Sequence, residues 1–144
     1  MIKIYSPYSK KQLKVILPLS ESETEQSFQK SLIEQKKWQL SSKEDRIRVI
    51  EGFNSYFLDN RNEIGHMISS FMGRPIRFSP KEVETAVIRA EVILDRFRSF
   101  SFQDLLDKNR EINHIPLGNI LIFGAWNYPL LTAVNSIIPA LLTG

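Results

Sequence analysis

Cysteine is missing from all 144 residues of the chain, and histidine occurs only twice. The absence of cysteine excludes a disulfide framework, a thiolate zinc site and a cysteine nucleophile carried by these residues. The two histidines, His66 and His114, lie far apart in the sequence, so no metal site is expected. The six glycines form neither a Gly-x-Gly-x-x-Gly sequence nor a P-loop, the usual glycine-rich phosphate-binding motifs.

A strong excess of one charge is also missing. Nineteen Lys and Arg against sixteen Asp and Glu leave a formal net charge of +3. The basic residues between Lys30 and Arg48 are interleaved with acids, which is typical of a solvated helix face, so we expect no nucleic-acid partner. The length is that of about one domain, and the composition is globular. We therefore treat residues 1–144 as one unit with no internal boundary.

The amino terminus has no long apolar run. The segment Val15–Leu19 is shorter than the roughly 7 to 15 residues of a signal-peptide core, and no small-residue cleavage site follows it. We therefore expect a cytoplasmic protein.

The first hundred residues predict a hairpin followed by four amphipathic helices. Apolar residues alternate with polar ones on both sides of a Ser6–Ser9 turn, as in two short strands. Ser22 with Glu25 predicts a capping box for a helix from roughly Glu23 to Trp38. The later helices are predicted by a cap at Ser42 and Asp45, by Asn60 and Gly73 at the two ends of the third, and by Ser79, Pro80 and Glu82 at the start of the fourth.

The last thirty residues contain no charged side chain. Asn119–Phe123 is rich in β-branched and aromatic residues and predicts a buried strand, while Pro129–Leu142 predicts a helix that is apolar all round. Both need cover on several sides, as in a parallel sheet wrapped by helices. The fold class is therefore α/β: a hairpin and amphipathic helices leading into the first strand-helix unit of an incomplete doubly wound sheet. A membrane helix competes for this stretch, although prolines, glycines and asparagines interrupt it.

Asn127 lies in the turn between this predicted strand and helix. Ligands of open α/β sheets bind at such turns, and a neutral side-chain amide can stabilise an oxyanion that develops on a carbonyl oxygen. The alternative is that Asn127 only caps the following helix.

The stretch His114–Leu131, centred on Gly-Ala-Trp-Asn-Tyr-Pro at 124–129, closely resembles the strand and turn that carry the oxyanion-hole asparagine in NAD(P)-dependent aldehyde dehydrogenases. The upstream order is also similar, with an initial hairpin, helices, Met-Gly-Arg-Pro at 72–75 and then a long helix. The resemblance covers essentially the whole chain. It implies a partial cofactor-binding domain, corresponding to the amino-terminal third of such an enzyme.

This resemblance implies roles for individual residues. In the family a cysteine thiolate attacks the aldehyde, an asparagine amide holds the oxyanion, hydride passes to NAD or NADP, and a glutamate activates water to release the acid. The implied roles are catalytic for Asn127, cofactor-binding for Phe123, Gly124, Ala125 and Trp126, and substrate-binding for Tyr128.

The family's nucleophile, its general-base glutamate and the rest of its cofactor site correspond to positions after Gly144. We therefore expect the 144-residue chain alone to be inactive, and a complete enzyme to be a homo-oligomer that acts on a small-molecule aldehyde. We expect no membrane partner. Two other hypotheses stay open: a non-catalytic helical module or pseudogene product that docks through Ile115–Leu142, and a membrane-anchored helical protein.

Overall fold

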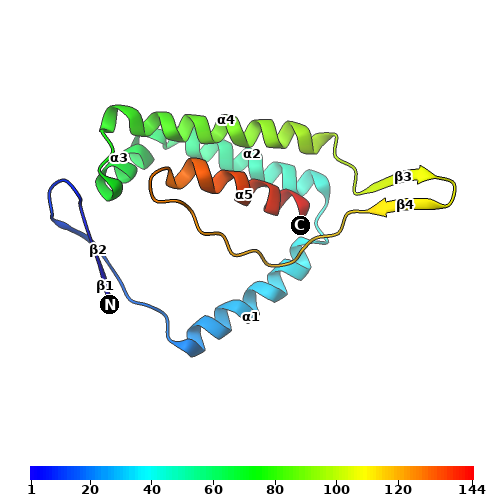
Figure 1. Ribbon diagram of the computed structural model, residues 1–144, viewed down its shortest axis with the longest axis horizontal. Coiled ribbons are helices and arrows are strands. Elements are labelled where there is room, and N and C mark those ends of the chain that lie inside the picture. The colour runs from blue at the N-terminus through cyan, green and yellow to red at the C-terminus, as the bar shows by residue number, and fades with distance from the viewer.

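The computed structural model describes residues 1–144 as two antiparallel hairpins and five α-helices (Figure 1). In chain order the elements are β1 (Ile2–Tyr5), β2 (Gln12–Ile16), α1 (Glu21–Trp38), α2 (Lys43–Asp59), α3 (Arg61–Met72), a 3₁₀ turn (Ile76–Phe78), α4 (Ser79–Arg98), β3 (Gln103–Asp107), β4 (Arg110–Asn113) and α5 (Pro129–Thr143). This mixture of helices and strands confirms the predicted class in outline.

The central element of the fold is α4, which packs against α2, α3 and α5. Figure 1 shows these four helices gathered together, while α1 and the β1–β2 hairpin extend away from them. The core consists of eight buried residues contributed by α2, α4 and α5: Ile50, Ala86, Ala90, Leu94, Phe97, Val134, Ile138 and Leu142. No residue of α1 is buried, so this helix is held mainly through its last turn.

Local sequence signals place most helix ends. Ser42 accepts a hydrogen bond from the backbone nitrogen of Asp45 at 3.0 Å and begins α2 as predicted. Gly73 ends α3 in the left-handed conformation, with φ of 79°, which glycine adopts without steric cost. Asn60 stands at the start of α3 but makes no side-chain cap.

The capping box of α1 lies two residues earlier than expected. Ser20 and Glu23 form it: the Glu23 carboxylate accepts from the Ser20 nitrogen at 2.8 Å, and the Ser20 hydroxyl accepts from the Glu23 nitrogen at 3.3 Å. The predicted pair, Ser22 and Glu25, has the same spacing, so the motif alone did not distinguish the two registers.

The predicted cap of α4 is wrong. Phe78 occupies the N-cap position after a 3₁₀ turn, and the hydroxyl of Ser79 instead shares a hydrogen bond of 2.7 Å with that of Ser69. Glu82 does not cap its own helix, because its side chain is buried against α5.

The predicted buried strand at 119–123 does not form. This segment lies in a long loop between β4 and α5, and Leu121 and Phe123 are largely exposed. A parallel strand needs neighbouring strands for its backbone hydrogen bonds, and both sheets here are two-stranded antiparallel hairpins at other positions. Of the expected strand-helix unit, only the helix, α5, forms.

Sequence reasoning also missed the β3–β4 hairpin. Its two adjacent leucines, Leu105 and Leu106, break the alternation that marks a half-buried strand. The signal that could have found it is the turn, where the Asp107 carboxylate accepts a hydrogen bond from the Asn109 nitrogen at 2.9 Å.

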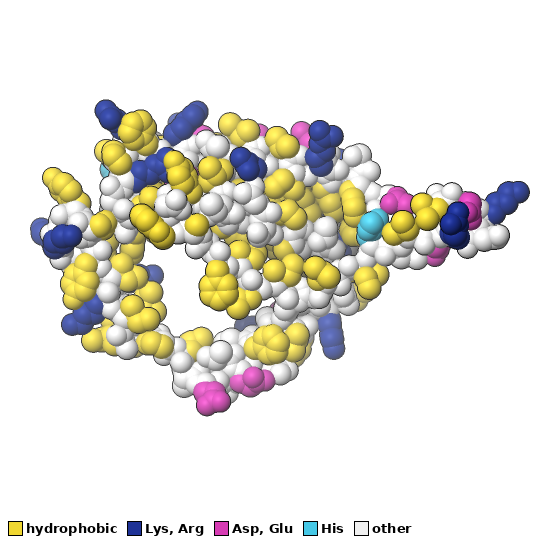
Figure 2. Space-filling view, in the orientation of Figure 1, with side chains coloured by type: hydrophobic (Ala, Val, Ile, Leu, Met, Phe, Trp, Pro, Cys, Tyr) yellow, Lys and Arg dark blue, Asp and Glu magenta, His cyan; other side chains and the backbone are white.

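The chain leaves a large surface exposed to solvent. Its accessible area is 10470 Å². A compact monomer of this mass would expose about 7,600 Å², so the excess is close to 3,000 Å². Figure 2 shows one reason: an opening separates the helical body from α1 and the amino-terminal hairpin, and apolar side chains line its rim.

Candidate functional site

The candidate residues from Phe123 to Tyr128 lie together in the last part of the loop that leads into α5. All six are exposed, and Phe123 and Trp126 are 87% and 77% accessible. Gly124 lies beside the start of the helix, because a β-carbon there would be 3.6 Å from the Pro129 carbonyl oxygen. The expected crevice between a strand and a helix is therefore replaced by a turn that is open to solvent on one side.

Asn127 lies in this turn, directly before the N-cap residue Tyr128. The interpretation of Asn127 as a helix cap is wrong, since no side chain of the turn caps α5. The carboxamide of Asn127 makes none of the hydrogen bonds found in the structure, which leaves both of its N–H donors available.

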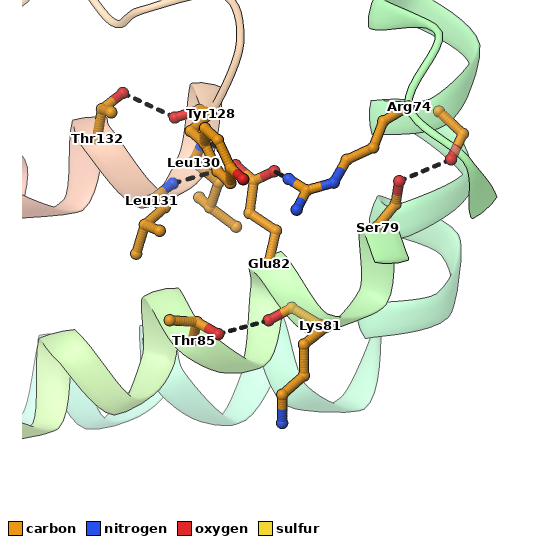
Figure 3. A network of polar contacts seen from close by, with 10 residues as sticks. Arg74, Ser79, Lys81, Glu82, Thr85, Tyr128, Leu130, Leu131 and Thr132 are labelled. Atoms are coloured by element: carbon orange, nitrogen blue, oxygen red, sulfur yellow. Dashed lines mark hydrogen bonds and ion pairs between the residues drawn. The ribbon is translucent and has the colours of Figure 1, made fainter. Parts of the chain in front are cut away.

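The cap of α5 comes from α4 instead. Glu82 has a fully buried carboxylate, and its Oε1 accepts hydrogen bonds from the backbone nitrogens of Leu130 at 3.1 Å and Leu131 at 3.3 Å (Figure 3). Its Oε2 accepts a charge-assisted bond of 2.5 Å from Nη1 of Arg74. A carboxylate at this end of the helix also complements the helix dipole.

Arg74 extends this network to the turn. Its guanidinium lies 4.5 Å from the centroid of the Tyr128 ring, within the range of a cation–π contact. The backbone carbonyl of Tyr128 accepts from the Thr132 hydroxyl at 2.7 Å. Residue 128 is thus held through both its ring and its main chain.

Sequence reasoning took Glu82 for the acid of a local capping box and so missed this role. A signal was present, because Glu82, Ala86 and Ala90 follow one another at spacings of four. They share the buried face of α4.

The carboxyl end of α5 is held by side chains from α1 and α2. Trp38 donates from Nε1 to the Leu141 carbonyl at 2.9 Å, and Gln35 donates to the Gly144 carbonyl at 3.1 Å. Arg46 donates to the Leu142 carbonyl at 3.1 Å, and burial lowers the pKa of its guanidinium. α5 therefore has an acid at its positive end and a base at its negative end.

Two recesses next to α5 lie away from the candidate residues. One is bounded by α1, the 118–122 loop and α5, and its apolar lining includes Trp38, Ile120 and Leu141. Another lies beside it, around Phe102, His114 and Ile120. Neither includes Asn127 or its neighbours, so the candidate residues form one open wall rather than an enclosed pocket.

Two further features bear on the hypotheses. No group of three or more His, Asp or Glu side chains converges as a metal site would require. No helix combines the length and the apolar character needed to cross a bilayer.

Comparisons with known proteins agree on one family. The family model described as "Aldehyde dehydrogenase family" matches residues 1–144. The provisionally named aldehyde dehydrogenase AldY of Bacillus subtilis (strain 168) is 27% identical to the chain over 150 residues, which is 98% of this chain and 30% of that protein. The N-succinylglutamate 5-semialdehyde dehydrogenase of Pseudomonas fluorescens (strain Pf0-1) is 28% identical over 110 residues, or 74% of this chain and 22% of the relative.

A solved structure shows the same fold. The NADP-dependent glyceraldehyde-3-phosphate dehydrogenase of Bacillus halodurans C-125, complexed with NADP, superposes with a TM-score of 0.91 at 24% identity. The match covers 99% of this chain and 32% of that one. The matches thus span 22% to 32% of the length of these proteins.

Proposed function

The chain belongs to the aldehyde dehydrogenase family, and on that premise we propose that it is part of an NAD(P)-dependent oxidoreductase that converts aldehydes to carboxylic acids. Its proposed contribution is the oxyanion-hole asparagine, Asn127. The observation that carries the proposal is the position of this residue: its carboxamide has no partner and lies in the turn before a helix whose start is already capped.

The proposed chemistry of Asn127 follows from its amide group. When a nucleophile attacks an aldehyde, the carbonyl oxygen gains negative charge, and a positioned N–H donor stabilises that charge more than it stabilises the neutral aldehyde. Asn127 would donate to this oxygen and lower the barrier to attack. Tyr128, which is partly exposed beside it, would line the approach of the aldehyde.

NAD or NADP would supply the hydride acceptor. The residues proposed to lie beside the nicotinamide are Phe123, Gly124, Ala125 and Trp126, whose exposure leaves both main chain and aromatic faces available to a planar ring. The start of α5 does not suit the cofactor's phosphates, because Pro129 has no N–H and Glu82 occupies the next two amides. These residues therefore fit the nicotinamide part alone.

The proposed reaction needs groups that these 144 residues do not contain. With no cysteine, the chain cannot supply the thiolate that attacks the aldehyde. We propose that this nucleophile and the general base belong to sequence outside residues 1–144, and that the assembled enzyme is a homo-oligomer. The alternative, a module that docks through Ile115–Leu142, is not favoured, because α5 already packs against α4 within the chain.

A chimeric enzyme tests the proposal. Residues 1–144 would replace the matching segment of Bacillus subtilis AldY, and NAD(P)H formation would be followed with a panel of aldehydes. Asn127→Ala should lower kcat by about 100- to 1,000-fold, as expected for loss of one oxyanion donor. The matched control is Asn135→Ala, which removes an exposed asparagine of α5 whose side chain contacts Arg89 and Leu131.

The two variants separate a catalytic role from a structural one. Equal turnover in the Asn127 and Asn135 variants would contradict the proposal, as would a folded chimera with no turnover on any aldehyde. Aldehyde-dependent NAD(P)H formation by the purified 144-residue chain alone would contradict the need for an external nucleophile.

A further inference from the structure

We infer that Glu82 and Arg74 are positioning residues for Asn127. Together they fix the first turn of α5 and the ring of Tyr128, and so restrict the backbone from which the carboxamide of the preceding residue extends. The inference rests on the proposed function, which gives that carboxamide its purpose. Neither Glu82 nor Arg74 lies in the turn itself, since they come from the start of α4 and the segment before it.

Glu82 is the fixed point of the arrangement. Its carboxylate is fully buried, and a buried charge is tolerated only when its oxygens are paired. Oε1 is satisfied by the amides of Leu130 and Leu131, and Oε2 by Arg74. Each of these bonds therefore depends on the others, because losing one leaves a buried oxygen without its partner.

Arg74 connects Glu82 to the turn. Its guanidinium is planar, so it can bond to the carboxylate through its edge while its face lies over the Tyr128 ring. Tyr128 follows Asn127 directly, and its carbonyl is held by Thr132. With residue 128 held at its ring and carbonyl, the backbone that carries Asn127 has little freedom at its carboxyl side.

The same contacts also decide which group can stabilise an oxyanion. A free helix start would offer backbone amides to an anion, but Glu82 occupies two of them and Pro129 lacks one. A carboxylate at this point would also repel negative charge. The neutral amide of Asn127 is therefore the donor left available, and its placement matters correspondingly more.

Amide hydrogen exchange and NMR on the 144-residue chain test this inference. In Glu82→Gln, the amides of Leu130 and Leu131 should exchange about 10- to 100-fold faster, because they lose a charged acceptor. Glu82→Gln and Arg74→Met should each increase the picosecond-to-nanosecond motion of the Asn127 carboxamide, with unchanged helicity by circular dichroism. The double variant should increase this motion little more than either single variant does, because both residues act through one network. Arg74→Lys should restore part of the order by keeping the charge.

The matched control is Glu51→Gln, which removes the charge of Glu51 from its exposed ion pair with Arg98, 2.6 Å away. This variant should leave the motion of the Asn127 carboxamide unchanged. An Asn127 carboxamide in the wild-type chain that is as mobile as that of Asn109, in the β3–β4 turn, would overturn the inference. So would Leu130 and Leu131 amides that exchange at unstructured rates before any substitution. If the positioning variants behave as expected but Asn127→Ala leaves turnover of the chimera intact, the proposed function fails and the coupling stands.

Discussion

The indole nitrogen of Trp38 donates to the carbonyl oxygen of Leu141 across 2.9 Å, joining the last residue of α1 to the last turn of α5. Because α1 buries no residue of its own, this bond is the main attachment of the helix, together with the bond from Gln35 to the Gly144 carbonyl and the bond from Arg46 to the Gln39 carbonyl. The placement of α1 is thus decided at one end, where polar side chains meet backbone carbonyls.

Trp38→Phe should loosen α1 without unfolding the core formed by α2, α4 and α5. The variant loses one hydrogen bond and leaves a carbonyl unpaired, which should cost about 1 to 2 kcal/mol. Limited trypsin digestion should cleave faster after Lys36 and Lys37 in this variant. Trp126→Phe is the control, because Trp126 is 77% exposed, and the cleavage pattern of this variant should match the wild type.

Ile138→Ala should destabilise the core strongly. Ile138 is fully buried among α2, α4 and α5, and removing a buried aliphatic side chain of this size costs about 2 to 5 kcal/mol. Ile33→Ala removes the same atoms from an exposed position on α1 and should change stability by less than about 0.5 kcal/mol. Urea unfolding followed by circular dichroism measures both, and equal midpoints would contradict the assigned core.

Gly73→Ala and Gly52→Ala should change the free energy of unfolding in opposite directions. At Gly73 the backbone is left-handed and a β-carbon would lie 2.8 Å from Cγ of Pro7, so alanine should cost about 1 to 2 kcal/mol. At Gly52, inside α2, a β-carbon would meet nothing within 4 Å, and alanine should stabilise by about 0.5 to 1 kcal/mol. Thermal unfolding gives both signs. A stabilising Gly73→Ala would contradict the close approach of the amino-terminal hairpin to α3.

The start of α1 should weaken in acid. Hydrogen bonds from Ser20 lower the pKa of the Glu23 carboxyl below its ordinary value. A lowered pKa in the folded state means that the ionised form contributes stability above the ordinary carboxyl range, and that this contribution is lost as the pH falls through the lowered value. The helical carbon chemical shifts of residues 20–24 should therefore decrease as the pH falls below the ordinary carboxyl range. Glu23→Gln should remove this pH dependence. If the chemical shifts of the variant changed with pH as those of the wild type do, the capping box would be contradicted.

The helices were predictable because their signals are local. The caps at Ser42 and Gly73 and the apolar stripe of α4 depend on residues within a few positions of one another. The strand expected at 119–123 was not predictable in the same way. Its apolar residues indicate burial, but a strand forms only where another strand supplies hydrogen-bond partners, and no local pattern shows this.

The site was predictable only in part. The start of α5 at Pro129 was predicted from local signals. Asn127 was chosen as a candidate from the chemistry of an amide at a helix start, and its role stays a prediction. The partners that hold the turn were not found. Glu82 lies 48 positions before Leu130, and a contact over that separation leaves no periodic signal that a local reading can detect.

The side chains that bond to the two ends of α5 all come earlier in the chain than α5 itself: Gln35, Trp38, Arg46 and Glu82. A ribosome adds about 5 to 20 residues per second, whereas a helix forms in about a microsecond. The helices that carry these side chains, α1, α2 and α4, can thus form seconds before α5 is synthesised. Synthesis from the amino terminus would therefore produce the most apolar helix of the protein only after the helices that bind it have folded.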